Sequence, residues 1–551
     1  IYTLPLHDAL PIFRDFEKIL IRDLQNTARA NRVANPNRIF ADIKLPTASP
    51  VEILDDSCSC EVLDIDLEDN SITLSNNPQF DDSLPIISPD GLIDPIICSD
   101  DKIWAEKVDH IQIGTTLRQE KFVGDLEELF RRFGDEWRKR WDRHVEMPVD
   151  YWDPVVAHFT KNTPRGEPMP HTKISLDTWY NTLKKKKSRS AVGPDGWSRQ
   201  DLLHMPKYQT QVLLDLLYAI ECGKEWPSSL LVGLVHSLEK IPNASKISQY
   251  RPITLFSVIY RCWSSIRSRE ILRHVSRYAP TGCFGNVPNR SASQVWMGVQ
   301  TAIEAANHDS TTISGAIVDV VKCFNHLPRI PMMEVITHLG VHPNLVSTWF
   351  RALQGMVRRF SIRGSAGPPI KSSTGCAEGC GLSVVGMFAI NCLIDCFMKH
   401  RAPEVKLLSF VDNMEVISNR AHLTREGLYQ LRRITELLDI QLDEKKTVVW
   451  SNDKKERKYL RDSEHQVAMW TRELGGHVQF SKQMTNSVIT NRIKNFKSRW
   501  PDIARSQAPY TQKLKAIKMV AWQNALHGIT SVHLGDEHYE HLRTGDRKSV
   551  V

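Results

Sequence analysis

Two aspartates in this sequence each follow a short apolar segment, in the position where a β-strand would end. Asp319 closes the stretch GAIVD, and Asp412 follows Ser-Phe-Val at the expected tip of a hairpin. Carboxylates at strand ends can share two divalent metal ions, and paired metal ions catalyse phosphoryl transfer. An isolated Asp between a strand and a loop is more often a turn former or a helix cap, so other motifs must support this interpretation.

Four further motifs stand around the two aspartates in a defined order. AVGPDGW (191–197) and YRPITL (250–255) come before Asp319, GCAEGCGLS (375–383) lies between the aspartates, and LDEKKT (442–447) follows them. Together with GAIVDVVKCFNHLP (315–328) and SFVDNME (409–415), this ordered set resembles the reverse transcriptases of non-LTR (LINE-like) retrotransposons. The specific motifs cover about residues 175–455, and a looser resemblance extends to about residue 545.

The resemblance implies a fold, an activity and a set of ligands. The fold class is α+β, a right-hand polymerase with a ferredoxin-like antiparallel palm, fingers and a helical thumb. Residues 151–455 would form fingers and palm, and 456–545 the thumb, with helices near 493–504 and 513–526. The activity would be RNA-directed DNA synthesis from dNTPs on an RNA template and a DNA primer, within target-primed integration. Asp319 and Asp412 would bind Mg²⁺, with Mn²⁺ as a substitute.

Two basic residues are expected to grip the incoming triphosphate. Lys240 and Arg251 belong to a predicted hairpin with strands at 231–239 and 249–257, joined through Pro242 and Asn243. A planar guanidinium suits bidentate phosphate binding, and a lysine supplies a mobile charge. The alternative is that both are solvated surface cations.

Phe324 and Lys446 also have roles implied by the resemblance. Phe324 would lie beneath the sugar, where its ring takes the space of a ribose 2′-hydroxyl and so favours DNA over RNA synthesis. Core packing is compatible with that role. Lys446 would help to protonate or neutralise the leaving pyrophosphate. Because Lys445, Lys454 and Lys455 are near it in sequence, a solvated basic face is the alternative.

The sequence departs from the family pattern at two positions. Asn413 stands where a second Asp is common, and an amide brings no negative charge. Glu378 replaces the usual Gln beside Gly379, in the motif that touches template and nucleotide in relatives. A working variant would tolerate Asn413→Asp with modest change, whereas a decayed polymerase that only binds nucleic acid would regain activity. A host-domesticated or bacterial intron-type enzyme is a further alternative.

Charge is distributed very unevenly along the chain. Residues 51–101 hold 14 Asp and Glu and no Lys or Arg. Subtracting these 14 negative charges from the formal charge of +7 leaves +21 for the other residues. A basic body suits a phosphate backbone as partner, with binding that weakens as salt rises.

The N-terminal region, residues 14–150, has no readable function. Residues 14–50 predict an amphipathic helix followed by a loop, and 120–145 a second helix that begins near Phe122. The acidic segment 51–101 alternates in polarity, with Asp69 and Asn70 as a hairpin turn. It could be a small β module or a solvated linker.

The remaining observations concern compartment and chain ends. Eleven cysteines without a secreted disulfide spacing favour a reducing, intracellular location, cytoplasmic or nuclear. Cys376, Cys380, Cys392 and Cys396 are more readily explained as core residues than as a zinc set. No run of about 20 apolar residues was found, so no membrane is expected as a partner. Residues 1–13 and 546–551 resemble a translated sequencing adapter, which predicts that the natural protein continues past both ends.

Overall fold

A computed structural model describes most of the chain. It describes residues 53–123 with several short gaps. It also describes residues 124–505, except for 149, 187–189, 242–243, 245, 462–463 and 482–486, and the single residue 527. The expected helix within 14–50, the hairpin loop at Pro242 and Asn243, the second thumb helix at 513–526 and both adapter-like ends lie outside the described residues.

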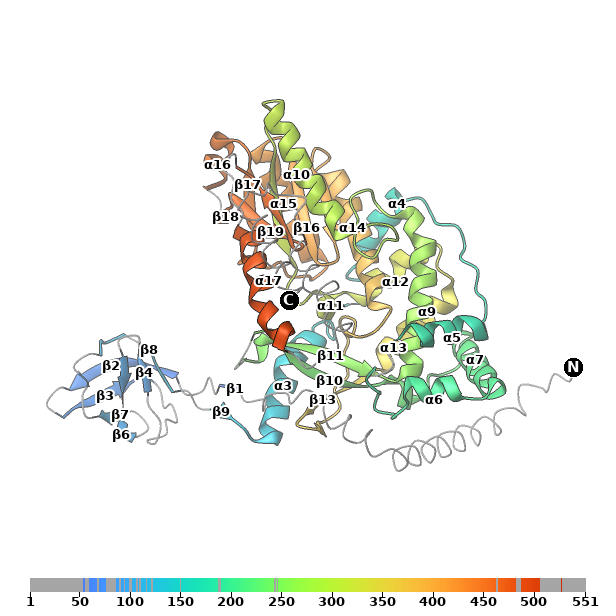
Figure 1. The fold of residues 1–551 in the computed structure, drawn as a ribbon, viewed down its shortest axis with the longest axis horizontal. Coiled ribbons are helices and arrows are strands. Elements are labelled where there is room, and N and C mark those ends of the chain that lie inside the picture. Colours follow the sequence, from blue (N-terminus) through green and yellow to red (C-terminus); the bar gives the residue numbers. More distant parts are fainter. Residues whose placement is uncertain are drawn as a thin grey trace, which may run out of the picture.

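The acidic segment forms a β module, which decides between the two alternatives for it. Figure 1 shows the module at the left, apart from the main body. Its seven strands have the order β5-β4-β8-β2-β3-β7-β6, and the β2–β3 hairpin turns at Asp69 and Asn70 as predicted. Ile72, Ile103 and Leu117 are fully buried in its own small core. The strands are β2 (Ser59–Asp66), β3 (Ser71–Leu74), β4 (Ile86–Ser88), β5 (Gly91–Ile93), β6 (Pro95–Cys98), β7 (Lys102–Ala105) and β8 (Thr116–Gln119).

The predicted helix near 120–145 begins later than expected. Phe122 belongs to the short strand β9 (Phe122–Val123), which pairs with β1 (Ile53–Leu54). Helix α3 (Leu126–Trp141) starts after Asp125, whose carboxylate accepts a hydrogen bond from the backbone N–H of Glu128. This capping bond satisfies one of the free N–H groups of the first turn and fixes the start of the helix.

The fingers combine a sheet and a group of helices. The sheet has the order β11-β10-β13-β14, and β10 with β11 forms the predicted antiparallel hairpin, with Leu238 opposite Arg251. Helix α3 packs across this sheet through Phe133, Trp137 and Trp141. The elements are α4 (Asp153–Asn162), α5 (Leu176–Lys185), α6 (Arg199–His204), α7 (Lys207–Glu221), α8 (Ser228–Leu231), β10 (Val232–Glu239), β11 (Tyr250–Phe256), α9 (Val258–Val275), β13 (Val357–Ile362), β14 (Ser365–Ala366) and the 3₁₀ turns η1 (Ile247–Gln249) and η2 (Ser276–Tyr278).

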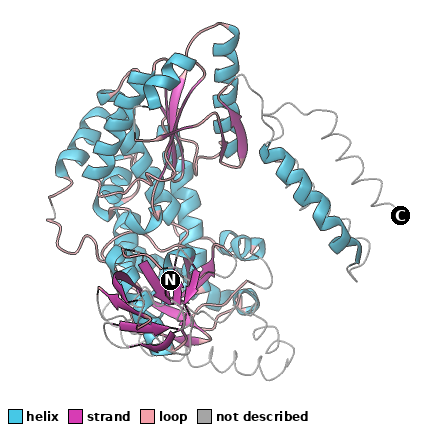
Figure 2. Cartoon of the chain, turned by 90° about the vertical axis from the view of Figure 1, so that its left-hand side faces the viewer, coloured by secondary structure: helices cyan, strands magenta, loops and turns pink. Residues whose placement is uncertain are grey.

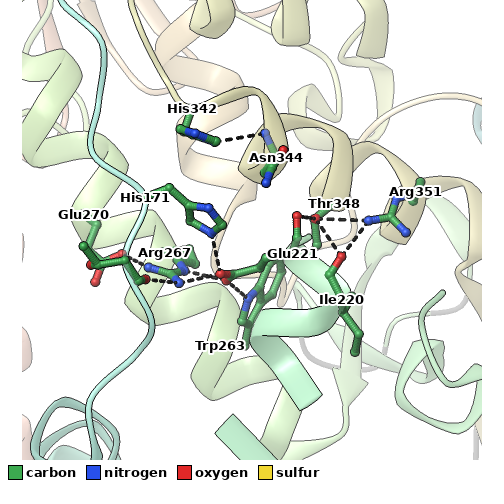
Figure 3. A network of polar contacts seen from close by, with 11 residues as sticks. His171, Ile220, Glu221, Trp263, Arg267, Glu270, His342, Asn344, Thr348 and Arg351 are labelled. Atoms are coloured by element: carbon green, nitrogen blue, oxygen red, sulfur yellow. Dashed lines mark hydrogen bonds and ion pairs between the residues drawn. The ribbon is translucent and has the colours of Figure 1, made fainter. Parts of the chain in front are cut away.

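A buried ion pair ties the helices behind the fingers sheet together (Figure 3). The Glu221 carboxylate of α7 accepts two hydrogen bonds of 2.6 Å from the Arg267 guanidinium of α9. Trp263 Nε1 donates to the same carboxylate at 2.7 Å, and His171 Nε2 lies 2.8 Å from it. Removing one partner of such a pair would leave a buried charge uncompensated, so separating α7 from α9 is costly. The network therefore holds α9 in place, and strand β11 directly precedes α9.

The palm sheet has the strand order expected of a ferredoxin-like fold. Its order is β15-β16-β12-β17-β18, antiparallel except for the pair β17–β18. The chain follows a β-α-β-β-α-β path through β12, α14, β15, β16, α15 and β17. The elements are α10 (Ala292–His308), β12 (Ser314–Asp319), α11 (Cys323–His326), α12 (Arg329–His338), α13 (Pro343–Gly355), α14 (Ser383–Arg401), β15 (Lys406–Phe410), β16 (Asn413–Ser418), α15 (Ala421–Leu437), β17 (Val448–Ser451), α16 (Lys454–Arg461) and β18 (Gln466–Val467).

Both faces of the palm sheet are covered, which explains the continuous burial of β12. Helices α14 and α15 pack on one face. The other face carries Ile317, Leu408 and Trp450 and is covered by α10 and by the hairpin of β19 (Trp470–Glu473) and β20 (Gly476–Gln479). Phe480 directly follows β20, and its ring stacks on that of Trp450 with centroids 4.6 Å apart. This hairpin therefore lies directly against the strands that carry the two aspartates.

Two helices bear on expectations made above. Helix α17 (Ser487–Arg505) includes the first predicted thumb helix, and Figure 2 shows it as a long helix beside the main body. Helix α14 is, among the described residues, long and apolar enough to cross a membrane, which the sequence reading overlooked. Its apolar window is 83% buried within the protein, as in an ordinary core helix.

Candidate functional site

The two aspartates lie at one end of the palm sheet, Asp319 on a strand and Asp412 in the turn before the neighbouring strand. Asp319 is the last residue of β12 and pairs in register with Asn413, the first residue of β16. Asp412 precedes Asn413 in the tight turn after β15, and it lies close enough to Asp319 for the two charges to interact. Both side chains are half-buried. The structure thus brings together two carboxylates that are 93 positions apart in the sequence.

The local charges show how closely these carboxylates interact. Burial raises the pKa of Asp412, and the negative charge of Asp319 raises it further. The Lys446 ammonium lies 2.5 Å from Asp319 Oδ2 and 3.2 Å from Asp443 Oδ2. The hydrogen bond to Asp319 raises the pKa of Lys446 and keeps it charged. Lys446 therefore belongs to the site and is not simply part of a solvated basic face.

The donor set fits a hard divalent cation. Asp319 and Asp412 offer only oxygen atoms, which Mg²⁺ prefers, and Mn²⁺ accepts the same donors. The repulsion that raises the pKa of Asp412 is the repulsion that a cation between the two carboxylates would relieve. Asp319 and Asp412 are therefore the residues that would hold the ions.

A second group of charges lies where the fingers sheet meets the palm. The ammonium groups of Lys240 and Lys322 both donate to the backbone carbonyl of Ser248, at 3.0 and 3.3 Å. Burial, together with the nearby positive Lys240, lowers the pKa of Lys322 to about 7. Arg251 is exposed, and its charge acts on both Glu378 and Asp412. The three cations form a cluster that an anionic ligand would stabilise.

Glu378 is fixed by a relay of side chains that begins in the fingers. Trp141 Nε1 donates to Asn325 Oδ1 at 2.9 Å, and Asn325 Nδ2 donates to Glu378 Oε1 at 2.8 Å. Burial raises the pKa of Glu378, although the hydrogen bond from Asn325 opposes this. Gly379 has φ +122°, and a Cβ there would lie 2.1 Å from the Thr254 carbonyl oxygen. Only glycine lets this loop rest on β11, beside Arg251.

Phe324 lies in α11, five positions after Asp319. Its half-buried ring packs against the main core. Its backbone carbonyl accepts a hydrogen bond of 2.7 Å from Cys376 N, in the loop that contains Glu378. The backbone at Phe324 is thus anchored to the loop that contains Glu378 and Gly379, and the role of the ring beneath the sugar stays a prediction.

Sequence reasoning missed two residues of this site. Lys322 stands three residues after Asp319 in the left-handed region, with φ +47°, and its place in the segment DVVK could have identified it. Glu473, on β19, accepts a hydrogen bond of 3.3 Å from Asn413 Nδ2. No local motif marks Glu473, because its partner lies 60 residues away.

The buried Glu473 carboxyl predicts a specific dependence of stability on pH. Burial, with a contribution from Asp319, raises its pKa from 4.5 to about 7. Between these values the unfolded chain has lost the proton and the folded chain keeps it, so this group's contribution to stability falls as pH rises. As pH rises from 5 to 7, we expect the melting temperature of the parent to fall relative to that of Glu473→Gln. One proton changes the unfolding free energy by up to about 1.4 kcal/mol per pH unit.

The measurement is thermal unfolding of both proteins across pH 5–8 in metal-free buffer. A constant difference between parent and variant at every pH would show that Glu473 does not titrate there.

Comparison with known proteins identifies a family model that matches the central part of the chain. Residues 241–461 match the family model described as reverse transcriptase (RNA-dependent DNA polymerase). No curated protein matches the chain. Among solved structures, an apo telomerase from Candida tropicalis, truncated from its C-terminal domain, is similar with 11% identity and a TM-score of 0.35. The match covers 45% of this chain and 53% of that one, so it spans about half of the telomerase structure and is too distant to support an argument.

The matched segment contains Arg251, Asp319, Phe324, Glu378 and Asp412. It also contains the palm sheet up to β17, with the α+β arrangement expected of a right-hand polymerase. Residues 241–461 are therefore similar to a reverse transcriptase domain, the family described as RNA-dependent DNA polymerase.

Proposed function

We propose that this chain is the reverse transcriptase of a non-LTR (LINE-like) retroelement, which extends a DNA primer on an RNA template by two-metal nucleotidyl transfer. The observation that carries the proposal is the proximity of Asp319, at the end of β12, to Asp412, in the adjoining β15–β16 turn, within the segment that matches the reverse transcriptase family model. The order of the six motifs supports the non-LTR assignment. Such an enzyme would work inside the cell, in the cytoplasm or nucleus, where its RNA template and chromosomal primer are found.

Each residue of the site has a chemical task in this proposal. Asp319 and Asp412 would hold Mg²⁺, which when bound activates the primer 3′-hydroxyl and neutralises the triphosphate. Lys240, Lys322 and Arg251 bind the triphosphate oxygens, and this ligand would favour the charged form of Lys322. Those cations lie where the fingers sheet meets the palm, so they orient the triphosphate toward the palm carboxylates.

The remaining side chains act on the sugar, the leaving group and the template. Phe324 excludes the ribose 2′-hydroxyl, and Lys446 supplies positive charge to the leaving pyrophosphate. The hydrogen-bonded relay from Trp141 through Asn325 holds Glu378 beside the nucleotide. Helix α17 would act as part of a thumb on the template–primer duplex, whose backbone the basic body of the chain attracts.

The test is primer extension with the full chain, dNTPs and Mg²⁺ on matched RNA and DNA templates. We expect extension on RNA, loss of extension with EDTA, and recovery with Mg²⁺ or Mn²⁺. Duplex binding should weaken as salt rises, because lysines and arginines contact the phosphates. Binding without extension under all metal conditions would instead favour the alternative of a decayed polymerase that only binds nucleic acid.

A further inference from the structure

The residue after the metal-site aspartate is held by a carboxylate from outside the sheet. Asn413 Nδ2 donates a hydrogen bond of 3.3 Å to Glu473 Oε1. Glu473 is the last residue of β19, in the hairpin that covers this face of the palm sheet. The covering hairpin therefore contacts the turn that presents Asp412.

A second buried carboxyl lies next to this contact. Asn413 and Glu415 are two positions apart on β16 and so share one face of the strand. Glu415 and Glu473 are only 2% and 4% exposed. Burial raises the pKa of both carboxyls, and the negative charge of Glu473 raises that of Glu415 further. The space between the sheet and the hairpin thus already contains two acidic groups, with Asp319 close enough to act on Glu473.

This environment distinguishes an amide from a carboxylate at position 413. Asn413 brings no charge and donates an N–H to Glu473. An aspartate of the same shape would have no N–H to donate and would add a negative charge beside Glu473. The amide that departs from the family pattern therefore suits this acidic surrounding better than a second carboxylate would.

The turn between β15 and β16 depends on contacts of this kind. Val411 has φ +59°, a left-handed conformation that is unfavourable for a β-branched residue. Asn391 Nδ2 of α14 donates to the Val411 carbonyl at 3.2 Å. The contact from Glu473 holds the same turn from the opposite face of the sheet, on the other side of Asp412.

We propose that Glu473 is a positioning residue that acts through Asn413: the two form a matched pair that fixes the turn carrying Asp412. The inference rests on the proposed function for its consequence in catalysis. Asn413 is then a functional part of the site. An aspartate at this position would reduce activity as long as Glu473 is present.

The experiment is a double-mutant cycle with Asn413→Asp, Glu473→Gln and the double variant. The contact with Glu473 revises the modest change that the sequence led us to expect: Asn413→Asp should lower kcat by about tenfold or more, as loss of a partner that orients a metal ligand typically does. Glu473→Gln keeps a carbonyl acceptor for Asn413 and should cost about threefold or less. In the double variant the side-chain amide introduced at position 473 can donate to the carboxylate introduced at position 413, so activity should return close to that of Glu473→Gln alone.

Two measurements separate positioning from general damage. The first is the Mg²⁺ concentration at half-maximal extension, which should rise for Asn413→Asp and recover in the double variant. The second is the melting temperature of all four proteins in EDTA. It measures the coupling between positions 413 and 473 in the absence of metal and substrate. Glu464→Gln, at an exposed carboxylate away from this contact, is the matched control and should behave as the parent.

The outcomes are distinct. Additive effects of the two substitutions in both readouts would overturn the pairing. An Asn413→Asp variant more active than the parent would also overturn it, because the site would then lack a carboxylate. If no variant extends any template, the proposed function fails, and the melting temperatures in EDTA still decide whether Asn413 and Glu473 are coupled.

Discussion

Replacement of Asp319 or Asp412 by asparagine should reduce primer extension by about a thousandfold or more, since a bound metal ion supplies several kcal/mol of transition-state stabilisation and each 1.4 kcal/mol is about tenfold in rate. The substitution keeps the shape of the side chain and removes the charge. Asp319→Asn would also weaken the hydrogen bond of 2.5 Å from the Lys446 ammonium, because an amide oxygen still accepts it but carries no negative charge. Both losses fall on the same step, nucleotidyl transfer.

Template–primer binding should survive these substitutions, because lysines and arginines dominate affinity for a phosphate backbone. The measurements are single-nucleotide extension and duplex binding by fluorescence anisotropy on the same preparations. Asp309→Asn, at an exposed carboxylate beyond the end of α10, is the control for loss of one negative charge. Near-normal extension by Asp319→Asn would mean that the palm carboxylates have been assigned wrongly.

Phe324→Ala should admit ribonucleotides by removing the ring that takes the space of the 2′-hydroxyl. We expect the preference for dNTP over rNTP to fall by about a hundredfold, the discrimination typical of a pocket that excludes one hydroxyl by shape. Extension with dNTPs should persist, because the backbone contact from Phe324 to the loop of Glu378 is unaffected. The measurement is kcat/KM for a matched dNTP and rNTP pair on one RNA template.

Phe324→Tyr is the matched control, because it keeps the aromatic ring and should keep the discrimination. The alanine variant also loses packing of a half-buried ring, at a cost of about 3 kcal/mol or less, which thermal unfolding would detect. An alanine variant that is destabilised yet discriminates as well as the parent would assign Phe324 to the core alone.

The sequence alone predicted the elements that carry the reacting groups. Apolar segments that end in Asp319 and Asp412 indicated strands, and the structure has β12 and the β15–β16 turn at those places. The hairpin of β10 and β11 and the β2–β3 turn at Asp69 and Asn70 were also predicted. These features are local: alternation of polarity and turn residues determine a strand and its end within a few residues.

The tertiary structure decided which of these elements meet. The contacts Asn413–Glu473 and Trp141–Asn325 join residues 60 and 184 positions apart. Lys240 and Lys322 meet at the backbone carbonyl of Ser248, to which both donate. Polarity patterns indicate which face of a strand is buried, but they carry no information about which distant segment covers it. Asn413 therefore looked like a missing carboxylate in the sequence, and only the packing of the β19–β20 hairpin gave its amide a partner.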